Sequence, residues 1–178
     1  ENNGTINGSV YLTEDRMNNN DAAYYFPGTT NSYIDLNHQI YEFNHGITVS
    51  TWFQDNNTSS NGRVISIGNP DASGSGLEIM KRPNNNNGIL TYFRSLYSGE
   101  SIYTLVENVF PSSDWHHYII SIDFLNLTYK VYIDGVVEIA DILSGSTNDW
   151  APFNTYNKVI NFGRKTASAY DPWKGKID

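Results

Sequence analysis

Aromatic residues and residues with amide or carboxylate side chains recur in the predicted loops, mostly in the last third of the chain. The aromatic members are Trp150, Tyr156, Tyr170 and Trp173, and the polar members are Asp71, Asn148, Asp149 and Asp171. An aromatic ring can stack on the face of a pyranose sugar, and polar side chains can fix its hydroxyl groups. Each ring could equally be a packing side chain, and both interpretations stay open.

Carboxylate catalysis needs a closer pairing than this sequence offers. A retaining glycoside hydrolase holds two carboxyl groups about 5 Å apart. Glu78, Glu100 and Glu107 have no partner at a spacing that would place two carboxylates together on one strand face. Glu138 and Asp141 are three residues apart and would face opposite ways on a strand. The sequence therefore predicts a protein that binds rather than an enzyme.

Metal and thiol chemistry are also restricted. The chain has no cysteine, which excludes disulfides and thiolate zinc sites. His116 and His117 are adjacent, so on a strand they point to opposite faces and cannot ligate one metal together. We expect one imidazole to pack near Trp115 and the other to form a hydrogen bond at the surface.

The charge and the length of the apolar runs restrict the possible partners. The net charge is −8, and the eleven Lys and Arg residues are scattered rather than gathered in a basic stripe, which excludes nucleic-acid binding. No apolar run approaches the length of a membrane span. The acidic surplus serves solubility, or some of its carboxylates bind a hard cation such as calcium.

Short strands separated by turns must position these residues. Segments such as Ile47–Phe53 and Thr128–Ile133 alternate between two faces, as strands of a half-buried antiparallel sheet do. Asp134-Gly135 lies between two β-branched runs and predicts a tight hairpin. Trp52 and Trp115 fall within strands and are assigned to the core. The expected strands are Ser9–Thr13, Ala22–Phe26, Ser32–Leu36, Ile47–Phe53, Arg63–Gly68, Gly76–Lys81, Ile89–Ser95, Glu100–Glu107, Trp115–Asp123, Thr128–Ile133, Val136–Ala140, Lys158–Gly163 and Lys174–Asp178.

This spacing of strands and turns predicts an all-β protein without helices, built as a sandwich or barrel. Several segments, in order along the chain, resemble the bacterial form of the laminin-G-like family in the concanavalin A-like lectin/glucanase superfamily. They are Asn2–Gly8, Ala23–Gly28 with Tyr33–Leu36, Ile47–Phe53, Trp115–Ile119 with Lys130–Gly135, Asn161–Arg164 and Lys174–Asp178. The resemblance implies a two-sheet antiparallel jelly-roll β-sandwich that occupies residues 1–178 as one domain.

The same resemblance implies a non-catalytic carbohydrate-binding or adhesive module. Its expected partners are a polysaccharide or glycan and the neighbouring domains of a larger, exported bacterial protein, secreted or on the cell surface. Two alternatives stay open: a structural spacer or protein-interaction domain that braces a neighbouring enzyme, and, least favoured, a glycoside hydrolase.

Two further expectations come from comparison with the family pattern. Members of the family often hold a structural ion near their joined termini, which implies calcium ligands at Asn3, Asp21 and Asp178. The family pattern also has a strand before the opening stretch and a longer final strand, and part of both is lacking here. We therefore expect an unfinished sheet edge near Thr5–Val10 and Lys174–Asp178.

Overall fold

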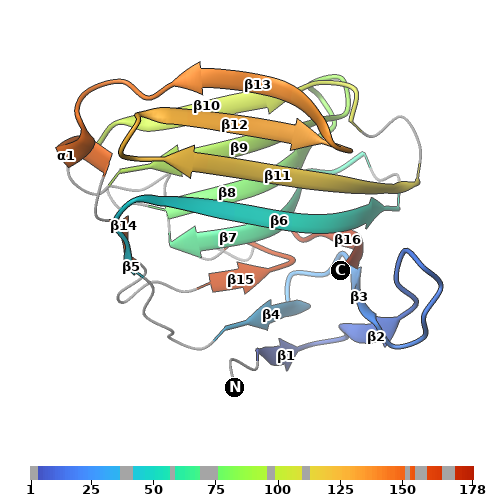
Figure 1. The fold of residues 1–178 in the computed structure, drawn as a ribbon. Helices are drawn as coiled ribbons and strands as arrows, with labels where there is room; N and C mark the ends of the chain where they lie inside the picture. Colours follow the sequence, from blue (N-terminus) through green and yellow to red (C-terminus); the bar gives the residue numbers. More distant parts are fainter. Residues whose placement is uncertain are drawn as a thin grey trace.

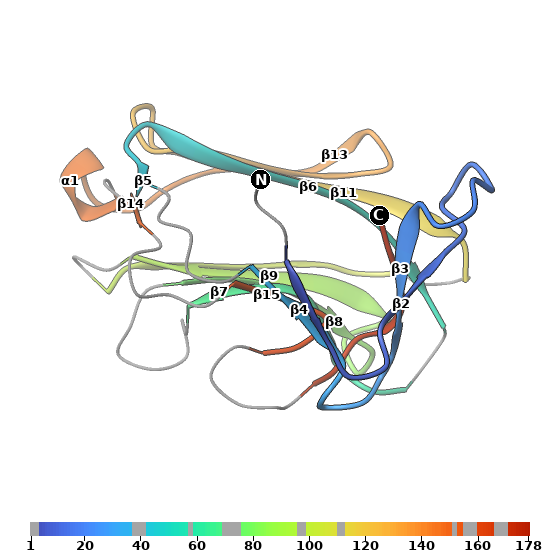
Figure 2. The same ribbon diagram turned by 90° about the horizontal axis from the view of Figure 1, so that it is seen from below.

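Two antiparallel sheets of seven strands each lie face to face (Figures 1 and 2). The structure is a computed structural model that describes residues 4–36, 42–56, 59–68, 76–95, 99–109, 113–150, 153–154, 160–165 and 171–178. The first sheet has the order β1 (Thr5–Asn7), β4 (Tyr33–Asp35), β15 (Ile160–Phe162), β7 (Gly62–Gly68), β8 (Gly76–Arg82), β9 (Gly88–Arg94) and β10 (Ser101–Val106). The predicted all-β sandwich is confirmed.

The second sheet faces the viewer in Figure 1. Its order is β13 (Val136–Ile142), β12 (Thr128–Ile133), β11 (Trp115–Asp123), β6 (Gly46–Asp55), β16 (Lys174–Ile177), β3 (Ala23–Pro27) and β2 (Tyr11–Thr13). A two-stranded sheet, β5 (Glu42–Phe43) and β14 (Phe153–Asn154), and the short helix α1 (Thr147–Trp150) complete the described elements.

The hydrophobic core lies between the two sheets. Phe26 and Phe53 from the second sheet and Leu77 and Phe93 from the first are fully buried there. Burying one such side chain contributes about 1.5–3 kcal/mol to folding. Strand alternation selects these residues, because every second side chain of a strand points to the same face.

A helix and two tryptophans differ from the sequence-based expectations. A helical turn, α1, forms where no helix was expected. Trp52 and Trp115 are half-buried, and both lie on the outer face of the second sheet. Phe53, the chain neighbour of Trp52, points into the core. His116, the chain neighbour of Trp115, lies opposite Phe53 on that same inner face. Their assignment to the core was therefore wrong: the strand positions were right, but the face was not.

The two histidines do lie on opposite faces, as predicted. His116 is paired with Phe53 and His117 with Trp52 in the β6–β11 register. The His117 ring stacks on Trp52 at 4.5 Å, and one of its nitrogens contacts the Ser50 hydroxyl at 2.9 Å. The stacking partner is thus Trp52 rather than the expected Trp115.

The position of β16 also corrects an expectation. Lys174–Ile177 pairs with β3 on one side and with β6 on the other, so this segment is an interior strand of the second sheet and not an edge. β1 does lie at an edge of the first sheet. Within the described residues, no helix is long and apolar enough to cross a membrane.

The turn at Asp134-Gly135 joins β12 to β13 as predicted, with φ values of 50° and 83°. Replacing both residues with Val should lower the free energy of unfolding by about 2 kcal/mol, because β-branched side chains resist positive φ. The Asp134 carboxylate also accepts a hydrogen bond from the His117 backbone at 2.7 Å. A thermal melt of the double variant measures the loss. Asp134→Asn is the control, because asparagine preserves the turn. An unchanged melting temperature of the double variant would contradict the register.

Candidate functional site

A row of mainly polar side chains crosses the outer face of the first sheet. Residues directly opposite one another in neighbouring strands share a face. The β-sheet register therefore aligns six residues, here called the polar row: Asp35, Asn161, Ser66, Glu78, Tyr92 and Tyr103. Their chain neighbours Ile65, Leu77 and Phe93 belong to the core, so the polar row points away from it.

The centre of the polar row is buried and ion-paired. The Glu78 carboxylate accepts hydrogen bonds from Arg63 Nε at 3.3 Å and Nη2 at 3.2 Å, and Ser66 Oγ lies 3.4 Å from its other oxygen. Arg63 also pairs through Nη1 with Asp171. This network fixes the Glu78 and Arg63 side chains, because a buried charge that loses its partner is strongly destabilising.

Asn161 is the unsatisfied member of the polar row. Its side chain is fully buried, and neither its Nδ2 nor its Oδ1 forms a hydrogen bond within the described part of the chain. Leaving a buried polar group without a partner costs about 1–3 kcal/mol. Such a group is a candidate to bind a polar group supplied from outside the chain, such as a hydroxyl or a water molecule.

Two tyrosines form the accessible end of the polar row. Tyr103, on the edge strand β10, is 66% exposed, and Tyr92 beside it is half-buried. Their rings meet edge to face, with centroids 6.1 Å apart. This end combines an aromatic surface with fixed polar groups on the adjacent strands, the composition typical of small-molecule binding sites.

The structure corrects the expectation that Trp150 and Trp173 present their rings to a ligand. Each is only 1% exposed and lies in the core. Trp150 stacks on Phe93 at 5.7 Å and donates Nε1–H to the Ser144 carbonyl at 2.7 Å. Trp173 meets Phe53 edge to face at 5.8 Å. Both rings are packing side chains, the other interpretation that the sequence left open.

The remaining predicted ligand-binding residues have different positions. Asn148 is exposed on α1, whereas Asp149 accepts hydrogen bonds from the Ser146 backbone at 2.6 Å and its hydroxyl at 2.9 Å. These bonds lower the pKa of the Asp149 carboxyl below its usual range. Asp171 is connected to the polar row through Arg63. The other predicted residues, Asp71, Tyr156 and Tyr170, lie outside the described residues.

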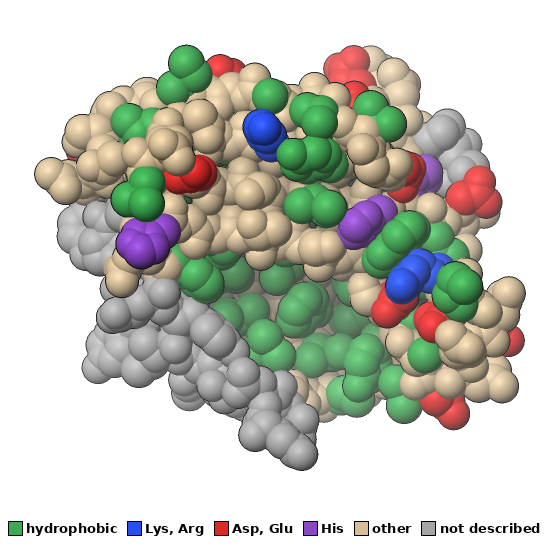
Figure 3. All heavy atoms as spheres, in the orientation of Figure 1, with side chains coloured by type: hydrophobic (Ala, Val, Ile, Leu, Met, Phe, Trp, Pro, Cys, Tyr) green, Lys and Arg blue, Asp and Glu red, His purple; other side chains and the backbone are tan. Residues whose placement is uncertain are grey.

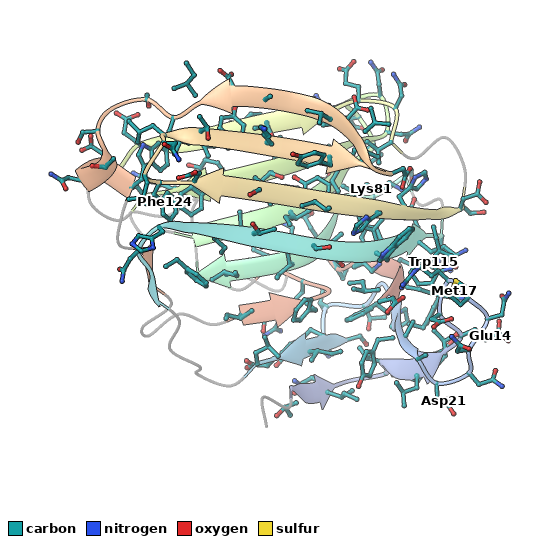
Figure 4. All side chains as sticks on the ribbon, in the orientation of Figure 1. Glu14, Met17, Asp21, Lys81, Trp115 and Phe124 are labelled. Carbon is teal, nitrogen blue, oxygen red and sulfur yellow. The ribbon has the colours of Figure 1, made fainter. Side chains whose placement is uncertain are left out.

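The predicted calcium ligands do not form a clear cation site. One Asp178 oxygen pairs with the Arg16 guanidinium, which already supplies a positive charge there. Asp21 lies on the loop between β2 and β3, at the lower right of Figure 4. Asn3 lies outside the described residues, and within those described no group of three or more His, Asp or Glu side chains could hold a metal. The arrangement fits calcium poorly, and the ion stays a prediction.

Two side chains of the same domain already lie against the Trp52 ring, so little of its surface is left for a ligand. His117 lies parallel to one face, at an interplanar angle of 7°, and the Arg16 guanidinium lies 4.7 Å from the ring centroid. The Arg16–Asp178 pair holds the guanidinium in this position. The outer face of the second sheet therefore offers less ring surface at Trp52 than Tyr103 offers on the first sheet.

Sequence reasoning missed the polar row. Arg63, Ser66 and Glu78 sit within strands that are otherwise rich in Val, Ile and Leu. A polar residue inside such a run is a signal, because a strand buried on both faces is expected to be continuously apolar. The alignment with Asn161 could not be found this way, since it depends on pairing between strands far apart in the chain.

Comparison with known proteins identifies the class of fold. The family model described as the concanavalin A-like lectin/glucanases superfamily, in its laminin G form, matches residues 27–178. The chain therefore belongs to this family, which confirms the resemblance found in the sequence. A comparison with curated protein sequences finds no match.

Solved structures of the same fold are distant in sequence. The carbohydrate-binding module CBM40 of the Ruminococcus gnavus IT-sialidase has a TM-score of 0.57 at 12% identity, covering 76% of this chain and 74% of that chain. Domains LG4-5 of the mouse laminin α1 chain give 0.65 at 16% identity, over 87% of this chain and 39% of that chain. A pentraxin from Limulus polyphemus gives 0.59 at 13% identity, over 86% and 71%. These similarities show the fold alone.

Proposed function

We propose that this domain binds carbohydrate, as a non-catalytic module of an exported or cell-surface bacterial protein. The observation that carries the proposal is the polar row, in which the exposed Tyr103 and the half-buried Tyr92 adjoin buried, fixed polar groups. A sugar ring could stack on Tyr103 while its hydroxyl groups reach the neighbouring polar side chains. One solved structure of the same fold, the CBM40 of the Ruminococcus gnavus sialidase, is bound to α2,3 sialyllactose, which supports this class of ligand.

The arrangement of carboxylates supports binding without catalysis. Asp35 and Glu78 lie three strands apart in the polar row, roughly 14 Å at the spacing of neighbouring strands. The carboxyl pairs of glycosidases are separated by about 5–9.5 Å. Glu78 and Asp171 both pair with the single guanidinium of Arg63, an arrangement that holds them as ion-pair partners rather than as an acid facing a substrate.

The proposal predicts that tyrosine substitutions weaken glycan binding. The purified domain is first screened on a glycan array, and affinity for the best glycan is then measured by titration calorimetry. Tyr103→Ala and Tyr92→Ala should each weaken binding by about tenfold, because an aromatic contact contributes on the order of 1 kcal/mol beyond the area it buries. Tyr11→Ala is the matched control, since Tyr11 is 55% exposed on the other sheet.

Two results would count against a glycan site at this position. Equal loss of affinity in the Tyr11 and Tyr103 variants would place binding elsewhere or indicate non-specific association. No binding to any polysaccharide at high protein concentration would favour the alternative of a spacer or protein-interaction domain.

A further inference from the structure

Positive charge gathers on one face of this acidic chain. Four of its five arginines lie on the outer face of the first sheet, beside the polar row: Arg63, Arg82, Arg94 and Arg164. Arg82 lies four residues beyond Glu78 on β8. Arg94 lies two residues beyond Tyr92 on β9, and even spacings along a strand share a face. Among its described residues, the opposite face of the sandwich, seen in Figure 3, shows Lys and Arg side chains only at separated positions.

Three of these arginines lie at the same end of neighbouring strands. The Arg164 guanidinium lies 3.3 Å from the ring centroid of Tyr33, which shares the outer face of β4 with Asp35. The strand order β15-β7-β8 places Arg63 between Arg164 and Arg82. Two strand spacings, roughly 10 Å, separate β15 from β8. Long arginine side chains can converge on one ligand across that distance.

Of these three arginines, Arg63 alone has carboxylate partners within the described residues. It pairs with Glu78 and Asp171. Arg82 and Arg164 are half-buried, and in the described part of the chain neither guanidinium forms an ion pair or a hydrogen bond. The Nε atom of each is buried without an acceptor, which costs free energy that an anionic ligand would recover. The planar fork of a guanidinium matches carboxylate and similar oxyanion groups.

We propose that this end of the outer face binds the anionic group, a carboxylate or a sulfate, of an acidic polysaccharide. The inference rests on the proposed function, because the same ligand stacks on Tyr103 at the end of the polar row. Arg82 is four residues along β8 from the row and two strands from β10, so its Cα lies roughly 16 Å from that of Tyr103. One sugar ring cannot span this distance, and the ligand is therefore a polymer.

A nucleic acid fits this surface less well. A phosphate backbone is bound by a continuous basic stripe along the protein, and two unpaired arginines do not form one. The net charge of −8 also repels a polyanion everywhere except at such a local cluster. An acidic sugar needs only one or two charged contacts, and the polar row beside the arginines supplies partners for its hydroxyl groups.

The test compares polysaccharides in matched pairs that differ only in charge: polygalacturonate with its methyl ester, and dextran sulfate with dextran. Titration calorimetry at low ionic strength measures the affinity of the domain for each. The acidic member of at least one pair should bind at least about tenfold more tightly than its neutral partner, and added salt should weaken it. The pair that shows the difference identifies carboxylate or sulfate as the recognised group.

Arginine substitutions locate the anionic group on the protein. Arg82→Gln and Arg164→Gln should each weaken binding of the acidic polysaccharide by about tenfold and leave the affinity for its neutral partner unchanged. Arg16→Gln is the matched control, because this fifth arginine lies beside Trp52 on the other sheet. If Arg164→Gln fails to fold through loss of its contact with Tyr33, Arg82→Gln still decides the outcome.

Three results would overturn the inference: equal binding of the acidic and neutral partners, equal effects of the three Gln substitutions, or binding of a DNA duplex as tight as that of the acidic polysaccharide. If Tyr103→Ala still weakened glycan binding in such a case, the proposed carbohydrate site would stand and only its acidic ligand would be wrong. No binding to any polysaccharide would remove the proposed function itself, and this inference with it.

Discussion

Replacing Asp55 with alanine should lower the free energy of unfolding by about 3–5 kcal/mol, the cost typical of breaking a buried ion pair from one side. Asp55 at the end of β6 pairs with the Lys81 ammonium, and both side chains are almost fully buried. The substitution leaves that ammonium in the core without its counter-charge. Figure 4 shows the position of Lys81 behind the second sheet. Chemical denaturation measures the loss.

A surface pair provides the control for this prediction. Arg16→Ala removes the ion pair with Asp178, whose side chains are 36% and 22% exposed, and should cost less than about 1 kcal/mol. The double variant Asp55→Leu/Lys81→Met should recover much of the loss, since apolar replacement of a buried pair is often neutral. Similar losses for Asp55→Ala and Arg16→Ala would show that the Lys81 environment is effectively solvated.

Replacing Trp150 with alanine should lower the free energy of unfolding by a similar amount, about 3–5 kcal/mol, through loss of buried surface and the cavity left behind. The ring packs on Phe93, and its Nε1 hydrogen bond to Ser144 fixes the turn before α1. Thermal and denaturant unfolding measure the effect. Ile142→Ala, on the exposed edge of β13, should change stability by no more than about 0.5 kcal/mol.

The same position separates a packing role from a binding role. Trp150→Phe keeps most of the buried ring and should fold, with glycan affinity unchanged from the wild type. If this variant lost glycan binding at an unchanged melting temperature, Trp150 would be a ligand contact after all, and the packing interpretation would be wrong.

The architecture could be predicted from local patterns, because strand alternation and turn residues act over a few neighbouring positions. Ile47–Phe53 and Asp134-Gly135 illustrate this, since the strand and the turn follow from residue types alone. The α1 turn was missed because it is only four residues long and lies in a segment that resembles a loop.

The candidate site was less predictable, for two physical reasons. First, the polar row is created by register: Asn161 meets Ser66 only because β15 pairs with β7, and no local pattern encodes that pairing. Second, aromatic residues in loops can pack inward or face solvent, and Trp173, which was predicted to contact a ligand, is buried in the core. Burial, and not residue type, distinguishes the two.

The interior position of β16 has a consequence for folding during synthesis. Residues 174–177 join β6 to β3 within the second sheet, so strands formed from residues 11–27 and 46–55 cannot be connected until the ribosome has released the last of them. Contacts between residues so far apart in sequence slow folding, because the chain must close a long loop before they form. Until residues 174–177 have left the ribosome, the nascent domain therefore exposes aliphatic strand surface, and chaperone binding to the nascent chain would shield it.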